Sequence, residues 1–166
     1  YMKKLFFCLL MGFSVGSFAT SSMGINWNSW DIDGTTVDGA GVMFSGNNGS
    51  FIYDVDIFKL SAGGADLTAN VTELGYAFGD SEAGAVFIGF QTADSNLNGV
   101  SRETDAQVGW VKRGGDGTQI KLSVVSDEDN SVLGDFQFPM GNGFFELGLW
   151  NNDGDTLWRI GYSWKF

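Results

Sequence analysis

The stretch TLWRIGYSWKF, residues 156–166, alternates between two kinds of side chain from Trp158 onward. Every second position from Trp158 to Phe166 is apolar or aromatic, and the positions between them carry arginine, glycine, serine and lysine. Successive side chains of a β-strand point to opposite faces, so this pattern predicts a strand with one aromatic and one polar face. Such an aromatic face is unfavourable in water and favourable against lipid. The pattern therefore predicts that this part of the chain lies in a membrane.

The same alternation recurs between turn signals rich in glycine, asparagine and aspartate. We expect ten strands, at residues 22–32, 36–45, 50–60, 67–78, 83–92, 103–113, 118–126, 132–138, 144–151 and 156–166. A spacing of about 15 residues per strand and turn favours antiparallel hairpins and excludes βαβ crossovers. Eight strands is the alternative.

The first expected strand changes its phase of alternation, because Ile25 and Trp27 fit one face whereas Trp30 and Ile32 fit the other. A β-bulge near Asn28 would bring both pairs onto one face. We then expect Trp30 to join Trp158 in an aromatic girdle at one rim of the sheet.

The composition supports a closed sheet and excludes one class of partner. The 166 residues include 25 glycines but only one proline, which would remove a backbone donor from a sheet. The net charge is −11, a surface that repels nucleic acid. Binding of DNA or RNA is therefore not expected.

Residues 1–19 have the organisation of a signal peptide, and Tyr1 is interpreted as an artefact preceding the start at Met2. Two lysines come first, then the apolar run LFFCLLMGFSVG, then the small-x-small site Ser17-Phe18-Ala19. The apolar run is shorter than the roughly 20 residues that a membrane-spanning helix needs. We predict cleavage after residue 19, with residues 20–166 forming the folded domain. A buried or anchoring helix is the alternative.

The polar face of the expected strands carries both signs of charge among many glycines. Its charged members are Asp54, Asp56, Glu73, Asp105, Lys121, Asp135, Glu146, Arg159 and Lys165. Opposite charges that pair within a narrow barrel satisfy the requirement that buried charges be compensated. We therefore expect this face to line the interior of the barrel. The alternative is a soluble, secreted barrel with this face in water and an apolar ligand inside.

The sequence resembles small Gram-negative outer-membrane β-barrel proteins. The resemblance rests on the aromatic strand 156–166 and the leader, and it covers the whole chain. It implies an all-β, antiparallel, up-and-down transmembrane barrel, exported through the periplasm into the outer membrane. It also implies that Tyr162, Trp164 and Phe166 form a signal for the barrel-assembly machinery. Outer-membrane lipid and lipopolysaccharide are the implied surroundings.

With both ends of the domain in the periplasm, the odd-numbered connections face outward, and they are rich in acidic residues. These residues are Asp31, Asp33, Asp66, Asp94, Glu103, Asp127, Glu128, Asp129, Asp153 and Asp155, with Arg102 as the expected base. Solubility of the loops explains them most simply. The sharper hypothesis is an outer rim that attracts divalent cations and bridges them to lipopolysaccharide phosphates.

The chain has no histidine, which removes the usual general base of hydrolases built on such barrels. Asp54 and Asp56 share a strand face, yet interior carboxylates are the simpler interpretation. The usual cysteine and histidine ligands of zinc and redox metals are lacking from the domain. We expect no enzyme activity and no cofactor. The predicted function is a narrow porin-like or structural barrel, and the alternative is a cell-surface interaction or adhesion barrel.

Overall fold

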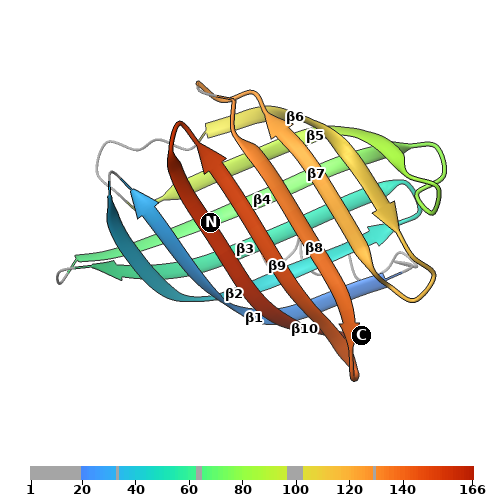
Figure 1. The fold of residues 1–166 in the computed structure, drawn as a ribbon, viewed down its shortest axis with the longest axis horizontal. Coiled ribbons are helices and arrows are strands. Elements are labelled where there is room, and N and C mark those ends of the chain that lie inside the picture. The colour runs from blue at the N-terminus through green and yellow to red at the C-terminus, as the bar shows by residue number, and fades with distance from the viewer. Residues whose placement is uncertain (1–19, 33, 63–64, 97–102, 129) are drawn as a thin grey trace, which may run out of the picture.

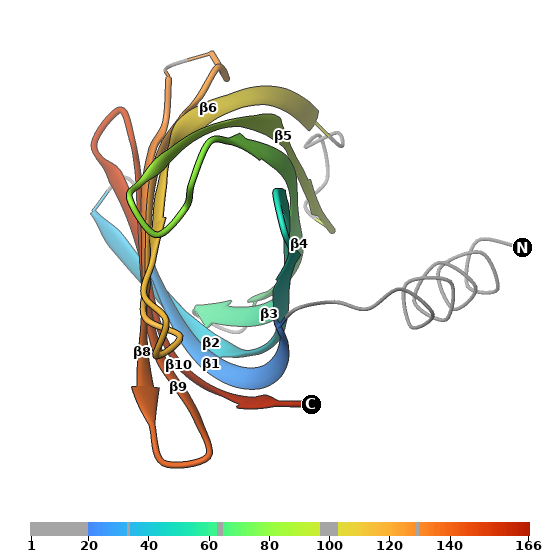
Figure 2. The same cartoon turned by 90° about the vertical axis from the view of Figure 1, so that its right-hand side faces the viewer.

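The structure is a computed structural model that describes residues 20–32, 34–62, 65–96, 103–128 and 130–166. The predicted signal peptide, residues 1–19, lies outside the described residues. The described part of the chain forms ten β-strands that close into one antiparallel barrel (Figures 1 and 2). The strands are β1 (Thr20–Ile32), β2 (Thr35–Asn48), β3 (Phe51–Ala62), β4 (Ala65–Phe78), β5 (Ala85–Ser95), β6 (Glu103–Arg113), β7 (Gln119–Val125), β8 (Val132–Met140), β9 (Gly143–Asn152) and β10 (Asp155–Lys165).

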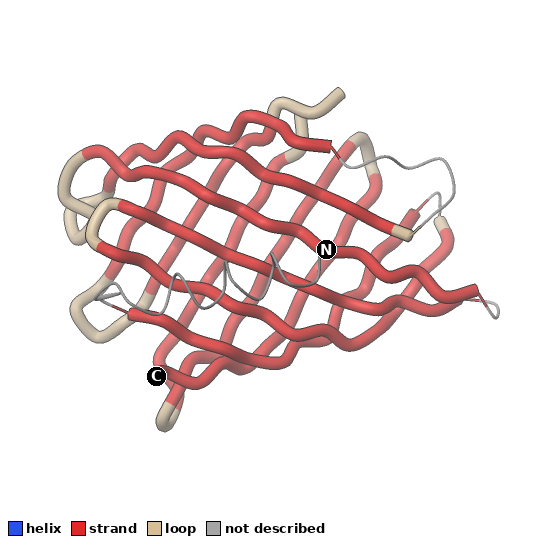
Figure 3. The backbone as a smooth tube through the Cα atoms, turned by 180° about the vertical axis from the view of Figure 1, so that it is seen from behind, coloured by secondary structure: helices blue, strands red, loops and turns tan. Residues whose placement is uncertain are grey.

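The predicted fold class is confirmed, and ten strands rather than eight is the correct number. Each strand pairs with its neighbours in sequence, and β10 pairs with β1 to close the ring. The strands run obliquely across the molecule, as closure of a sheet requires (Figure 3). Turn glycines such as Gly49 and Gly141, both with φ 60°, reverse the chain between strands. No helix in the described residues is long and apolar enough to cross a membrane.

The predicted bulge near Asn28 is wrong. The register of β1 with β2 runs without interruption from Thr20↔Asn47 to Ile32↔Thr35, and its register with β10 is equally regular. Because β1 keeps one phase, Trp30 points into the barrel, where its ring lies 5.9 Å from that of Trp150. Trp30 therefore does not join the outer girdle, whereas Trp158 remains exposed on the outside. The change of phase seen in the sequence of β1 arises because apolar side chains such as Trp30 fill the interior at this end of the strand.

The outward face is apolar on every strand. Its exposed members include Ile25, Trp27, Val42, Ile57, Leu74, Tyr76, Phe78, Val86, Ile88, Phe90, Val108, Trp110, Leu122, Val124, Phe138, Leu149, Trp158, Ile160 and Trp164. Several are more than half exposed, with Phe90 at 62% and Ile25 at 59%. A soluble barrel would place such side chains inside, so this arrangement excludes the soluble alternative and is that of a membrane barrel.

Glycine at position 39 permits a close approach between β2 and β3. A Cβ atom on Gly39 would lie 1.7 Å from the carbonyl oxygen of Lys59, which is far inside van der Waals contact. Neighbouring glycines on the same inward face are similarly crowded, because a Cβ on Gly41 would lie 2.3 Å from Asn26 Oδ1. These small residues allow the sheet to bend sharply where β1, β2 and β3 curve around one end of the barrel's cross-section (Figure 2).

Candidate functional site

A cluster of ionised side chains crosses the barrel interior and is the candidate site. Lys121 on β7 contacts Glu73 on β4, and its Nζ lies 3.0 Å from Asp135 Oδ2 on β8. Arg159 on β10 donates to Asp135 Oδ1 at 3.0 Å through Nη2. Asp135 thus accepts from both cations and links them. We call Asp54, Asp56, Glu73, Lys121, Asp135 and Arg159 the ion cluster.

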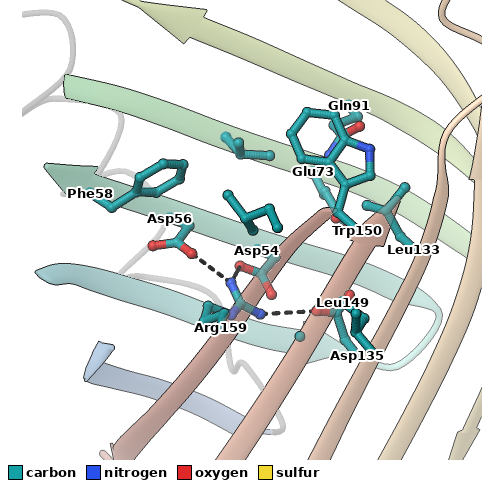
Figure 4. Close-up of a pocket in the computed structure, with 13 residues that line it drawn as sticks. Asp54, Asp56, Phe58, Glu73, Gln91, Leu133, Asp135, Leu149, Trp150 and Arg159 are labelled. Atoms are coloured by element: carbon teal, nitrogen blue, oxygen red, sulfur yellow. Dashed lines mark hydrogen bonds and ion pairs between the residues drawn. The ribbon is translucent and has the colours of Figure 1, made fainter. Parts of the chain in front are cut away.

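Arg159 also reaches β3, on the far side of β1 and β2. Its Nη1 donates to Asp56 Oδ2 at 2.8 Å and lies 3.9 Å from Asp54 Oδ1. Figure 4 shows the guanidinium between Asp56 and Asp135, with Asp54 beside it. The side chains of Lys121, Asp56 and Arg159 are all largely excluded from solvent. The cluster therefore ties together strands that are not neighbours in the sheet.

Two asparagines on β1 extend this chain of polar contacts. Asn26 Nδ2 donates to Asp56 Oδ1 at 2.7 Å, and Asn28 Nδ2 donates to Asn26 Oδ1 at 2.9 Å. Both asparagines are buried. Sequence reasoning missed them, although their inward phase on β1 is the signal that marks them. Asn26 Oδ1 and Asp56 Oδ1 thus each accept a hydrogen bond, whereas the buried Asn28 Oδ1 has no donor among the described residues.

The other predicted interior charges form no ion pair with the ion cluster in the described residues. Glu146 is buried and accepts a hydrogen bond from Ser163. Asp105 lies on the inward face of β6 opposite Gln91, and no ion pair in the described residues includes it. Lys165 is exposed, with its Nζ 4.2 Å from the centre of the Phe144 ring.

Two apolar clusters fill the interior on either side of the ion cluster, which sequence reasoning did not predict. The outer cluster comprises Phe58, Leu60, Leu67, Ala69 and Leu157, with Trp30, Val37, Val71 and Trp150 against it. The inner cluster, towards the end where β1 begins and β10 ends, comprises Ile52, Ala77, Ala85, Phe87 and Val111. The interior thus has an apolar cluster towards each end, although buried serines such as Ser22, Ser45 and Ser163 also lie at the inner end.

A cavity of about 50 Å³ lies between the ion cluster and the outer cluster. Its lining includes Asp54, Glu73 and Gln91 from β3 to β5 and Trp150 and Arg159 from β9 and β10 (Figure 4). Trp150 Nε1 and Arg159 Nε are buried donors without an acceptor among the described residues. A cavity of this size holds roughly three or four water molecules, which suit such donors.

The acidic residues of the outer rim do not converge. No group of three or more potential metal ligands exists in the described part of the chain. Asp127 accepts hydrogen bonds from Ser131 N at 2.9 Å, from Ser131 Oγ, and from Asn152 Nδ2 at 3.2 Å. Its carboxylate therefore shapes the β7–β8 loop. Asp129 lies outside the described residues.

Other members of the rim are exposed or have a local partner. Glu128 and Asp153 are exposed at the loop tips, and Asp155 is half-buried. Asp66 accepts from Ser61 Oγ at 2.8 Å and pairs with Lys59. Lys59 is a base at this end of the barrel that sequence reasoning overlooked when it assigned only Arg102.

The predicted assembly residues lie along the seam of the barrel. Tyr162 donates to the carbonyl oxygen of Met140 at 2.8 Å, and its ring lies 5.2 Å from that of Trp164. Phe166 N donates to Ser21 O at 3.2 Å, and the Phe166 ring lies 5.6 Å from that of Phe44. These aromatic residues thus form a patch on the outside of β10 and its neighbours.

No protein-family model and no curated protein matches the sequence. Seven chains of solved structures are similar, and they include the following three. Neisserial surface protein A is 11% identical over 89% of this chain and 96% of that chain, with a TM-score of 0.35. The Yersinia pestis outer membrane protein Ail in a phospholipid nanodisc is 12% identical over 89% and 99%, with a TM-score of 0.39. Ail from Yersinia pestis in complex with the heparin analogue sucrose octasulfate is 13% identical over 89% and 97%, with a TM-score of 0.37.

The location of the protein follows from the barrel itself. A closed antiparallel barrel with an apolar outer surface and a charged interior satisfies every backbone group within a membrane. Barrels of this arrangement are proteins of the Gram-negative outer membrane.

Replacing Arg159 by methionine tests the ion cluster. We expect Arg159→Met to lower the free energy of unfolding by about 3–5 kcal/mol, because Asp56 and Asp135 lose a buried counter-charge. Adding Asp56→Asn should recover part of the loss. Urea-induced unfolding in lipid vesicles measures these differences.

The control is Lys59→Met, which removes the exposed ion pair with Asp66. Exposed pairs contribute about 0–1 kcal/mol, so this variant should lose little. Equal losses in the two variants would contradict a special role for the interior cluster.

Proposed function

We propose that this outer-membrane barrel is a closed, structural protein that presents its outer loops, rather than an open diffusion pore. The observation that carries the proposal is the filled interior, in which the ion cluster joins opposite walls and an apolar cluster lies towards each end. Ions entering from the outer side would meet the buried hydrocarbon of the outer cluster before they reached the charges. A hydrophobic constriction opposes the passage of ions, because it cannot replace their hydration shell.

The same fold could also serve a porin-like function, in which solutes pass through the interior. The charges of the interior are engaged with one another, since Lys121 and Arg159 each bind two or more carboxylates. Charged groups that neutralise each other across a barrel act as cross-links. The proposal therefore gives the charged interior a structural role and includes no catalytic step.

Planar bilayer recording tests the proposal. We expect the wild-type barrel to show no regular conductance steps. The double variant Phe87→Ala, Trp150→Ala should produce measurable conductance, because it removes one bulky side chain from each apolar cluster and leaves the ion cluster in place.

A matched control is Phe90→Ala, Trp158→Ala, which removes the same residue types from the lipid-facing surface of β5 and β10. This variant should remain as closed as the wild type. Regular steps in the wild-type protein would support the porin-like alternative and reject the closed barrel.

The second candidate is a cell-surface interaction or adhesion protein. The observation that favours it is the β7–β8 loop, where Asp127 accepts hydrogen bonds from Ser131 in the same loop and from Asn152 at the end of β9. The strand bounds leave short β1–β2, β3–β4 and β9–β10 connections, which offer a small binding surface. A closed interior is compatible with this function, so it remains a proposal for what the loops do.

Divalent cations are proposed to gather at the outer rim as counter-ions that bridge it to lipopolysaccharide phosphates. We expect Mg²⁺ to raise the melting temperature more than NaCl of equal ionic strength, because a divalent ion neutralises neighbouring carboxylates more effectively. The double variant Glu128→Gln, Asp153→Asn should reduce this difference. Asp127→Asn should instead lower the melting temperature in both salts, because it weakens the β7–β8 loop. Equal effects of the two salts on the wild type would reject the cation hypothesis.

The barrel-assembly machinery is proposed to bind β10 through Tyr162, Trp164 and Phe166. Because β10 is the strand that closes the ring with β1, a delay at this strand would delay the whole barrel. We expect Phe166→Ser to reduce the amount of folded protein in cells, whereas refolding into lipid vesicles in vitro should change little. The gel mobility of unheated samples distinguishes folded from unfolded protein. A similar loss in both settings would indicate a purely structural role for Phe166.

A further inference from the structure

Gly148 lies within the ion cluster, although it has no side chain to contribute. It is buried on the inward face of β9, where it pairs directly with Arg159 on β10 and with Asp135 on β8. These three residues therefore form one row across three strands. The hydrogen bond from Arg159 Nη2 to Asp135 Oδ1, at 3.0 Å, follows this row and passes over the backbone of β9 (Figure 4).

The separation of β8 and β10 explains why the middle position of this row must be clear. Adjacent strands lie about 4.8 Å apart, so two strands on either side of a third lie about 10 Å apart. The arginine side chain crosses this gap by lying flat against β9. A Cβ atom on Gly148 would lie 3.1 Å from Arg159 Nε and 3.1 Å from Asp135 Oδ1, which is closer than carbon normally approaches such atoms.

Neither of the two side chains over Gly148 is free to move away. Arg159 Nη1 donates to Asp56 Oδ2 at 2.8 Å, so the guanidinium is held on both sides. Asp135 is held through its other oxygen, because Oδ2 lies 3.0 Å from Lys121 Nζ. A methyl group at position 148 would therefore lengthen one of these contacts rather than displace a mobile side chain.

The backbone at position 148 does not itself require glycine. Gly148 is not one of the described glycines with positive φ, and it lies within the regular ladders that β9 forms with β8 and β10. Inside a strand, glycine is less favourable than alanine, because it loses more conformational freedom on folding and has no side chain to pack. Alanine at this position should therefore stabilise the barrel, unless the space above Gly148 is needed.

We propose that Gly148 is the positioning residue that joins the two cations into one cluster. Lys121 is on β7, next to β8, and reaches Asp135 directly, whereas Arg159 reaches it only across Gly148. A side chain at position 148 would divide the cluster into two groups, one around each cation. The inference rests on the structural role proposed above for the ion cluster, and it adds that this role depends on a residue without charge.

A double-mutant cycle of Gly148→Ala and Arg159→Met tests the inference. Urea-induced unfolding in lipid vesicles measures the equilibrium constant of unfolding for each variant. We expect Gly148→Ala to raise this constant about tenfold in the wild-type background, because it crowds the held guanidinium. In the Arg159→Met background the increase should disappear, because the tip of a methionine side chain has no ionic partner and can move aside.

The matched control is Gly75→Ala on the inward face of β4. A Cβ atom on Gly75 would be similarly crowded, at 3.2 Å from Phe87 Cδ2, but this ring belongs to the inner cluster and not to the ion cluster. Gly75→Ala should therefore change the unfolding constant by the same factor with and without Arg159→Met.

The positioning role is overturned if Gly148→Ala stabilises the wild-type barrel, or if its effect is the same in both backgrounds. The structural role of the ion cluster fails separately, if Arg159→Met alone causes no loss of stability. Gel mobility of unheated samples shows whether each variant is folded. If Gly148→Ala alone does not fold, recovery of the folded form on adding Arg159→Met would support the inference, and no recovery would overturn it.

Discussion

Closure of the sheet between β1 and β10 is the constraint on which the rest of the structure depends. In hydrocarbon no water replaces a missing backbone hydrogen bond, so an open sheet edge is not tolerated within the membrane. The ladder from Ser22↔Lys165 to Asp31↔Thr156 removes the last edge. The outward face then needs only to be apolar, and the inward face must fill whatever space the closed ring encloses.

That enclosed space explains why the interior is not simply polar. Ten strands leave too little room for a wide channel and too much for glycine alone, so side chains from opposite walls meet. Charges meet as Lys121 with Glu73 and Arg159 with Asp56, and hydrocarbon meets as Phe58 with Leu157. Both kinds of contact brace the barrel, and together they close it.

The sequence allowed the strands and their faces to be predicted, because turn residues and period-two alternation are local signals. Asp54, Lys121 and Arg159 were assigned to the inward face on this basis alone. Which charges meet was beyond local signals, because partners across a barrel depend on strand tilt and closure. The inward Phe58, Phe87 and Trp150 were missed for a related reason. An apolar residue on the inward face has apolar neighbours on the outward face, so the alternation of apolar and polar residues is lost there. Trp30 is an example, because this inward tryptophan led to the incorrect prediction of a β-bulge.

The span of the ion cluster along the chain has a consequence for how the barrel folds. Arg159 and Asp56 are 103 positions apart, and Lys121 and Glu73 are 48 apart. Contacts between such distant residues form late, because the loop that they close has a high entropic cost. Until β10 arrives, Asp56 has no guanidinium partner and a buried carboxylate is unfavourable. An incomplete barrel in the membrane therefore carries the free-energy cost of an unpaired buried carboxylate. Pairing of β10 removes this cost in a single step. The same charges that brace the finished barrel thus make its folding more cooperative.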